Sequence, residues 1–305
     1  MPKIQYQDVA LTAQKLAVVK VADAIIHEYQ AQGFDLTLRQ LYYQFVARGY
    51  LPNHQKSYKR LQDIVNDGRL AGLLDWTAIV DRTRNLVSQT HWGSPERAVK
   101  RVAGMYREDV WADQPYRVEV WIEKDALMGI LDAVCPELDV PYFSCRGFNS
   151  QSEMWAAGRR MVTRAEHGQQ TVVLHLADHD PSGIGMSHDI AKRLTMFTTR
   201  HLKTANVFTL RRIALNMKQV ERYNPPPNFA KVTDPRYKKY RETYGESSWE
   251  LDALDPAVLV RLVRRKVAKW VDAEKMSAAV ARQEDARSQL QTVSGQWKRA
   301  LEACR

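Results

Sequence analysis

The first part of the chain carries apolar residues at helical spacing. Residues 9–31 place hydrophobic side chains three or four positions apart, and Gly33 is suited to end that helix. A second helix is expected to begin at Thr37, because Gln40 three residues later completes a capping box. This helix, LRQLYYQFVAR, is expected to stop at Gly49. The pattern therefore predicts two short amphipathic helices before residue 50.

A third helix and a β-rich segment follow. Ser57 is expected to cap a helix that Gly68 ends. Residues 73–84, LLDWTAIVDRTR, are then rich in Val, Ile and Trp. Three short helices and such a segment are typical of a winged-helix DNA-binding domain, although a small helical bundle has the same pattern. We interpret residues 1–112 as this domain.

From residue 113 onward, β-rich runs alternate with helical segments. The runs are RVEVWI, VPYFSC, TVVLHLA and NVFTLRRIAL, and the helix after the third is expected from about Ser187 to Arg200. Such alternation implies βαβ units and a mainly parallel sheet. The expected fold class is therefore α/β, with residues 113–305 as a second domain that ends in a helical extension from Pro256.

Composition narrows the class of protein. The net charge of +10 favours a polyanionic partner such as double-stranded DNA, although basic charge also serves solubility. No apolar run approaches the roughly 20 residues of a membrane span, and the first residues lack a signal-peptide pattern, so we expect a cytoplasmic, nucleoid-associated protein. Three widely spaced cysteines, Cys135, Cys145 and Cys304, argue against a disulfide framework and against a four-cysteine zinc site.

Carboxylates follow two of the expected strands. Asp178 and Asp180 come directly after TVVLHLA, and Glu123 ends RVEVWI. Ligands bind at the carboxyl ends of parallel strands, where neighbouring strands would bring these side chains together. Oxygen ligands suit Mg²⁺, which neutralises charge in phosphoryl transfer. We therefore expect a Mg²⁺ site at this edge, which Mn²⁺ is also expected to occupy.

Two other interpretations of the acidic turn remain open. The run D-x-D-x-S-G begins like an EF-hand calcium loop, with Asp189 at its twelfth position. Against this, the preceding segment is β-branched rather than helical, and Pro181 lies within the loop. The turn also suits a simple acidic cap of the next helix.

Two adjacent tyrosines occupy different faces of the second helix. Tyr42 falls on the apolar stripe that includes Leu38 and Phe45, and is expected in the core. Tyr43 lies off this stripe, four residues after Arg39, so their side chains can meet. The guanidinium is expected to favour the phenolate and to hold a phosphate, as a nucleophilic tyrosine requires. An ordinary surface tyrosine near an arginine has the same spacing.

These motifs together resemble a known family. The Glu of VEVWIEK and the later ADHDPSG resemble the TOPRIM signature of topoisomerases, primases and related nucleases. A Tyr-Tyr pair preceded by Arg, in a winged-helix-like domain upstream of a TOPRIM domain, resembles the A subunit of topoisomerase VI and the related meiotic double-strand-break protein. The segment SWELDALDP, Ser248 to Pro256, is similar to a segment near the end of that family's TOPRIM domain. The resemblance extends from about residue 35 to about residue 275.

The resemblance implies a reaction and its residues. It implies that Tyr43 forms a 5′-phosphotyrosyl link, that Arg39 steadies the phosphate, and that three carboxylates bind the metal: Glu123, Asp178 and Asp180. It also implies a homodimer in which the tyrosine of one protomer meets the metal of the other, and a separate ATPase subunit for strand passage. Lys124 and Arg146 are expected to contact phosphate. The alternatives are a TOPRIM nuclease that forms no covalent intermediate and a DNA-binding protein without catalysis.

Overall fold

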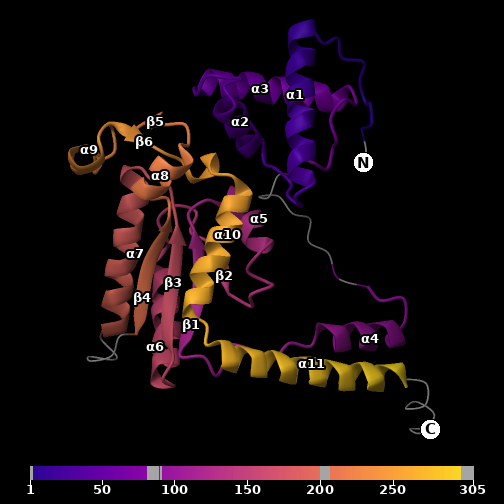
Figure 1. Ribbon diagram of the computed structural model, residues 1–305, viewed down its shortest axis with the longest axis vertical. Coiled ribbons are helices and arrows are strands. Elements are labelled where there is room, and N and C mark those ends of the chain that lie inside the picture. The colour runs from indigo at the N-terminus through magenta and orange to yellow at the C-terminus, as the bar shows by residue number, and fades with distance from the viewer. Residues whose placement is uncertain (1–2, 81–88, 90, 200–206, 297–305) are drawn as a thin grey trace.

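The computed structural model describes residues 3–80, 89, 91–199 and 207–296. Figure 1 shows a group of helices near the N-terminus, a parallel sheet covered by helices on both faces, and a long helical arm at the C-terminal end. The expected α/β class is confirmed by this sheet. Within the described residues, no helix is both long and apolar enough to cross a membrane.

The N-terminal helices have largely the expected positions. They are α1 (Ala13–Gln30), α2 (Leu38–Ala47) and α3 (Gln55–Leu70). The capping box at the start of α2 is confirmed, because Thr37 accepts a hydrogen bond from the Gln40 amide and Gln40 accepts one from the Thr37 amide. Apolar side chains of all three helices pack into one core.

The predicted ends of α3 are wrong. Its N-cap is His54, whose ring nitrogen accepts from the amide of Ser57, so Ser57 lies inside the helix. Gly68 also lies inside, facing α1, where a Cβ would come within 3.0 Å of Val19. Gly68 therefore permits close helix packing and does not end α3. Of the β-rich segment 73–84, the structure describes residues up to 80, with a single bridge between Leu36 and Ile79, and the remainder lies outside the described residues.

Four parallel strands form the central sheet. They are β1 (Tyr116–Ile122), β2 (Tyr142–Ser144), β3 (Gln170–Leu176) and β4 (Phe208–Ala214). Their order is β2-β1-β3-β4, and every pair is parallel. All four expected β-rich runs are thus strands. The carboxyl ends of β1 and β3, the two inner strands, lie side by side.

Helices cover both faces of the sheet. On one face lie α6 (Gln151–Glu166) and α7 (Pro181–Thr199), and on the other lie α5 (Met128–Asp132) and α10 (Pro256–Val267) (Figure 1). The period-two alternation of β-strands divides the apolar residues between two cores, on opposite faces. Val120 packs with α5 and α10, whereas the neighbouring Trp121 packs with α6 and α7.

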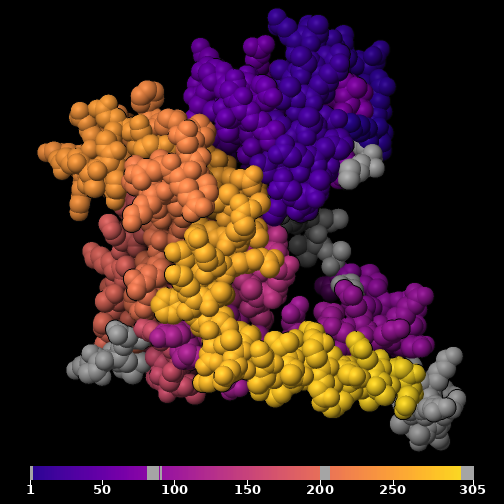
Figure 2. Space-filling view, in the orientation of Figure 1, coloured from indigo at the N-terminus to yellow at the C-terminus, as the bar shows by residue number. Residues whose placement is uncertain are grey.

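Two further parts project from the sheet domain. Helix α4 (Pro95–Met105) packs along α11 (Ala273–Gly295) to form the arm, which Figure 2 shows extending sideways from the base of the sheet domain. Residues 221–250, between the sheet and α10, contain a small two-stranded antiparallel sheet, which lies over the carboxyl edge of the central sheet. The remaining short elements are α8 (Met217–Tyr223), β5 (Asn228–Phe229), α9 (Tyr237–Tyr244), β6 (Ser247–Ser248), η1 (Asp125–Leu127), η2 (Leu251–Ala253) and η3 (Ala268–Trp270).

Candidate functional site

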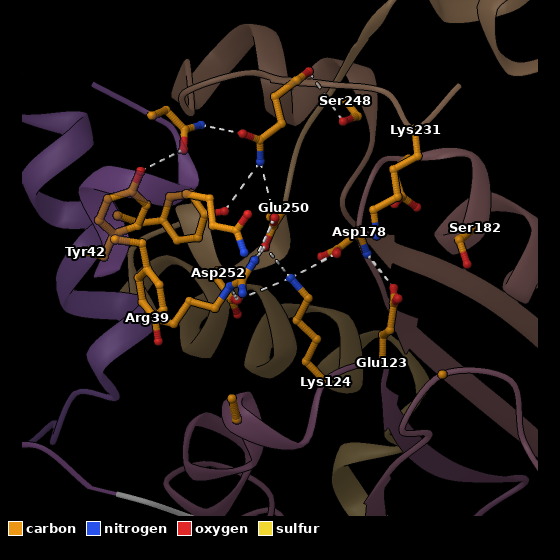
Figure 3. A pocket seen from close by; sticks show the side chains of 18 of the residues that line it. Arg39, Tyr42, Glu123, Lys124, Asp178, Ser182, Lys231, Ser248, Glu250 and Asp252 are labelled. Atoms are coloured by element: carbon orange, nitrogen blue, oxygen red, sulfur yellow. Dashed lines mark hydrogen bonds and ion pairs between the residues drawn. The ribbon is translucent and has the colours of Figure 1, made fainter. Parts of the chain in front are cut away.

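A cavity of about 800 Å³ lies between α2 and the carboxyl edge of the sheet. Its walls come from α2, from the loops after β1 and β3, and from the segments around β5 and β6 (Figure 3). All seven predicted site residues line this cavity: Arg39, Tyr43, Glu123, Lys124, Arg146, Asp178 and Asp180. The structure therefore brings together groups that the sequence places in two separate domains.

The sheet register places Glu123 beside Asp178. Ile122 of β1 pairs with Leu176 of β3, and the amide of Glu123 donates to the Leu176 carbonyl at 2.8 Å. The two chains leave the sheet together, so that Glu123 Oε2 accepts a hydrogen bond of 2.9 Å from the amide of Asp178. The predicted convergence at this edge is thus explained by parallel strand pairing.

Asp180 stands at the start of α7. Its Oδ1 accepts from the amide of Gly183 at 2.6 Å, and Pro181 is the first residue of the helix. Proline is well suited to that position, and so α7 begins six residues before the expected Ser187. A Cβ on Gly183 would overlap the Asp178 carbonyl, so this tight turn requires glycine. The helix-capping interpretation of the acidic turn is therefore correct for Asp180.

The EF-hand interpretation is wrong. The segment before Asp178 is strand β3, not the helix that an EF-hand requires. Asp189 lies on α7, where its carboxylate pairs with Arg193 at 3.2 Å.

The Asp178 carboxylate is held by protein donors. Its Oδ1 accepts from the amide of Leu251 at 2.8 Å, and its Oδ2 lies 2.9 Å from Lys124 Nζ. Lys124 lies in turn 2.8 Å from Glu250 Oε2 and 3.2 Å from Asp252 Oδ2. Figure 3 shows the Lys124 side chain between Asp178 on one side and Glu250 and Asp252 on the other. Its ammonium thus binds three carboxylates and, in this arrangement, is not the open phosphate contact that the sequence suggests.

Arg39 links the N-terminal helices to the sheet domain. Its guanidinium lies 2.8 Å from Glu250 Oε2 and 3.3 Å from Asp252 Oδ2. The same guanidinium lies 5.9 Å from the centre of the Tyr43 ring, so the expected meeting of these two side chains on α2 is confirmed. Arg146 is different, because its side chain is largely exposed and pairs with Asp125 at 3.1 Å on the cavity wall.

Both tyrosines of α2 are buried. Tyr42 lies in the helical core as expected, and its hydroxyl accepts from the amide of His54 at 2.9 Å. Tyr43 is buried as well, with only 3% of its surface exposed. Its hydroxyl lies 3.4 Å from Asn228 Nδ2 and faces the Glu250 carboxylate. Although Tyr43 lies off the apolar stripe, its ring packs in the same helical core, and its hydroxyl faces the other domain.

Arg39 favours the phenolate, as expected, but it does not decide the pKa of Tyr43. Burial and the negative charge of Glu250 raise the pKa of Tyr43, and they outweigh the opposing effects of Asn228 and Arg39. Glu250 itself stays ionised: burial would raise its pKa, but Lys124 and Arg39 lower it to about 2. The tyrosine is therefore protonated while Glu250 remains beside it.

Arg212 is a structural support of the site that the sequence analysis missed. Its guanidinium donates to the carbonyls of Ala177 and Gly183, each at 2.9 Å, and to the carbonyl of Asp178. These contacts fix the backbone from which Asp178 and Asp180 project. The strand pattern offered a signal: of the adjacent pair Arg211 and Arg212 in β4, alternation must turn one inward.

The acidic groups outnumber their cations near the loop. Burial and the charge of Asp180 raise the pKa of Glu123. Burial also raises the pKa of Asp178, together with the charges of Glu123 and Asp252, despite the opposing charge of Lys124. Carboxylates that resist ionisation for these reasons gain from a bound cation.

The donor set fits a hard cation in part. Glu123 Oε1 and Asp180 Oδ2 have no hydrogen bond to the part of the chain that the structure describes, whereas both oxygens of Asp178 are engaged. Among the described residues, no three acidic, histidine or cysteine side chains already stand in metal-binding geometry. Glu123 and Asp180 are thus the two side chains that would first hold Mg²⁺.

Among the residues that the structure describes, no group of histidine and cysteine side chains is arranged to hold a metal ion. His175 is buried in β3, where burial and Arg212 lower its pKa to about 3, and its Nδ1 contacts the Ser187 hydroxyl. Cys135 and Cys145 are buried free thiols, and Cys304 lies outside the described residues.

No family model matches the chain, and no curated protein matches it significantly.

Proposed function

We propose that the protein cleaves DNA by transesterification, with Tyr43 as the nucleophile and a TOPRIM-like carboxylate site for Mg²⁺. One observation carries the proposal: Tyr43 and Arg39 line the same cavity as Glu123, Asp178 and Asp180. The sequence resemblance to the topoisomerase VI A subunit, including its winged-helix domain, supports the assignment. The net charge of +10 supports a double-stranded DNA substrate.

The reaction forms one bond and breaks another. The Tyr43 hydroxyl oxygen attacks a backbone phosphorus and loses its proton, the bond from phosphorus to the 3′ oxygen breaks, and the 3′ oxygen leaves as a hydroxyl after it takes up a proton. Arg39 holds the phosphate oxygens through its guanidinium. A divalent cation held by Glu123 and Asp180 would neutralise the phosphate charge and stabilise the leaving oxygen. Arg212 keeps the carboxylate loop in place.

Other parts of the proposal rest on the resemblance alone. These are the homodimer, the separate ATPase subunit and an association with the nucleoid. Within one chain, Tyr43 already shares a cavity with its own carboxylates. The proximity of Tyr43 to the carboxylates therefore does not depend on a second protomer.

A second candidate is a metal-dependent nuclease in which water attacks the phosphate. The burial of Tyr43 and its raised pKa favour this alternative, because a protonated and enclosed phenol is a weak nucleophile. It shares the carboxylates with the first proposal but makes no use of the tyrosine.

Covalent trapping on supercoiled DNA separates the two candidates. With Mg²⁺ or Mn²⁺ and a denaturing stop, wild type is expected to give a protein–DNA adduct and Tyr43→Phe none. Tyr42→Phe is the matched control: it removes a hydroxyl from the same helix and the same cavity, and should retain the adduct. Cleavage that survives Tyr43→Phe without any adduct would establish the nuclease. Tight DNA binding with no nicking by wild type would rule out both enzymes.

A further inference from the structure

Three donors of the cavity converge on the Glu250 carboxylate. Arg39 Nη2 lies 2.9 Å from its Oε1 and 2.8 Å from its Oε2. Lys124 Nζ lies 2.8 Å from Oε2, and Asn228 Nδ2 lies 3.2 Å from Oε1. The donors come from α2, from the loop after β1 and from β5. Separate segments of the chain thus build one anion-binding position.

A phosphodiester would satisfy the same donors. Like a carboxylate, it spreads one negative charge over two oxygens, and guanidinium and ammonium groups bind both anions through charge-assisted hydrogen bonds. The position is reachable from the cavity, because 21% of the Glu250 side chain is exposed. It also adjoins Tyr43, whose hydroxyl lies 3.4 Å from the same Asn228 nitrogen.

We propose that Arg39, Lys124 and Asn228 form the binding site for the scissile phosphodiester, and that Glu250 occupies this site until DNA displaces it. This proposal rests on the proposed function, because it assigns the place of the substrate phosphate within that site. Displacement puts the phosphodiester beside the Tyr43 hydroxyl, where the Glu250 carboxylate now lies. Glu250 therefore keeps the phosphate position filled in the absence of DNA.

The surroundings allow Glu250 to leave without disrupting the site. The backbone is fixed on both sides of it, since the amide of Trp249 donates to the His179 carbonyl and the amide of Leu251 donates to Asp178. Displacement would therefore break the side-chain contacts of Glu250 and rotate that side chain, while the backbone stays in place.

Arg39 and Lys124 are also held by a second carboxylate. Asp252 lies 3.3 Å from Arg39 Nε and 3.2 Å from Lys124 Nζ, and its side chain is only 1% exposed. Both cations remain in position when Glu250 is exchanged for a phosphate.

Equilibrium binding of a fluorescein-labelled DNA duplex, at fixed salt and in EDTA, tests the site without cleavage. Glu250→Gln removes the competing charge, and its dissociation constant is expected to fall about tenfold below that of wild type. The matched control is Asp125→Asn, which removes a carboxylate paired with arginine from the wall of the same cavity. Its dissociation constant should change by less than about twofold, because only an exposed pair is lost.

Two further variants test why Glu250→Gln is expected to bind DNA more tightly. Adding Arg39→Gln to Glu250→Gln should remove the gain, since it deletes the main donor. Glu250→Asp keeps the charge but shortens the side chain by one methylene, and is expected to bind about two to three times more tightly than wild type. This variant carries the test if Glu250→Gln fails to fold. Binding no tighter than wild type in the folded variants would overturn the proposal and leave Glu250 as a link between domains.

The outcome is separable from that of the trapping experiment. If Glu250→Gln binds more tightly but wild type forms no adduct, the phosphodiester site stands and the transesterase does not. If wild type forms the adduct but the Glu250 variants bind no more tightly, the transesterase stands and the displacement by DNA does not. Absence of DNA binding by every variant would contradict both.

Discussion

Glu119 lies on strand β1, and Glu123 lies just after its end. The surroundings of the two carboxyls nevertheless have opposite effects on their ionisation. Glu119 is buried in β1 and faces α6, where Arg160 donates to both of its oxygens at 2.9 Å and Arg164 adds a further contact. Glu123 lies at the strand end, beside the acidic residues of the loop after β3.

The pKa values of the two carboxyls move in opposite directions. Burial would raise the pKa of Glu119, but the hydrogen bonds and charges of Arg160 and Arg164 outweigh it and lower the pKa to about 2. At Glu123, burial and the charge of Asp180 raise the pKa instead. In a buried ion pair of the core, each carboxylate is paired with protein cations. In a site that binds a cation, some carboxylates have no protein cation as a partner. The comparison therefore separates a carboxylate that is paired with cations in the core from one that lies unpaired in the candidate site.

The largest effect is expected at the structural carboxylate. Glu119→Gln leaves two guanidinium groups without their anion and should lower the free energy of unfolding by about 3 kcal/mol, as measured by denaturant titration. Glu137→Gln is the matched control, because Glu137 also pairs with an arginine, Arg264, but both side chains are about half exposed. Its loss should stay below about 1 kcal/mol. Equal losses of unfolding free energy in the two variants would mean that the buried pairing of Glu119 stabilises the fold no more than the exposed pairing of Glu137.

Acid should remove the Glu119 contribution. Its folded pKa is depressed, so its stabilisation is complete above the ordinary value of 4.5 and disappears as pH falls toward about 2. Between pH 5 and pH 3, wild type should lose about 2 kcal/mol of unfolding free energy that Glu119→Gln does not lose. Denaturant titrations of the two proteins across this range measure the difference. Parallel pH profiles would mean that Glu119 is not held ionised by its arginines.

The sequence predicted the parts of the fold that depend on local pattern. All four strands and the capping box of Thr37 and Gln40 were found because alternation, helical spacing and caps act within a few residues. The start of α7 was missed because Pro, Ser and Gly after Asp180 are also typical of a turn. Gly68 was misassigned because its function is to admit Val19 from another helix, which no local pattern reveals.

The site was predicted in part, and for a physical reason. The seven expected residues line one cavity. Strand ends indicate the carboxylates, whereas the pairing of Arg39 and Tyr43 with them comes from the family resemblance, which implies contact between two protomers and not within one chain. The pairing of Arg39 with Glu250 joins residues 211 positions apart and depends on how two domains meet. The same contact buries Tyr43 and reverses the expected direction of its pKa shift. Spacing along one helix shows which face a residue is on, but not what covers that face.

The smallest effect, of opposite sign, is expected at Glu123, the carboxylate of the candidate site. Glu123→Gln keeps an oxygen that accepts from the Asp178 amide and removes a charge that burial and Asp180 oppose. Because the folded pKa of Glu123 is raised, the ionised group costs stability above its ordinary pKa, so the variant should be more stable than wild type at neutral pH in EDTA, as measured by denaturant titration. Below that ordinary pKa the gain should vanish, since the carboxyl is then protonated in both states.

Divalent cations should make wild type more stable than Glu123→Gln, which is the reverse of the order expected in EDTA. If Glu123 and Asp180 bind the cation, Mg²⁺ or Mn²⁺ stabilises the folded wild type by mass action and raises its melting temperature. Glu119→Gln, whose carboxylate is paired with Arg160 and Arg164 inside β1, should show the same metal-dependent rise from a lower starting value. Glu123→Gln should begin higher and rise little. A rise in Glu123→Gln as large as that of wild type would place the cation elsewhere, and the unmatched charge at this strand end would then have to serve another ligand.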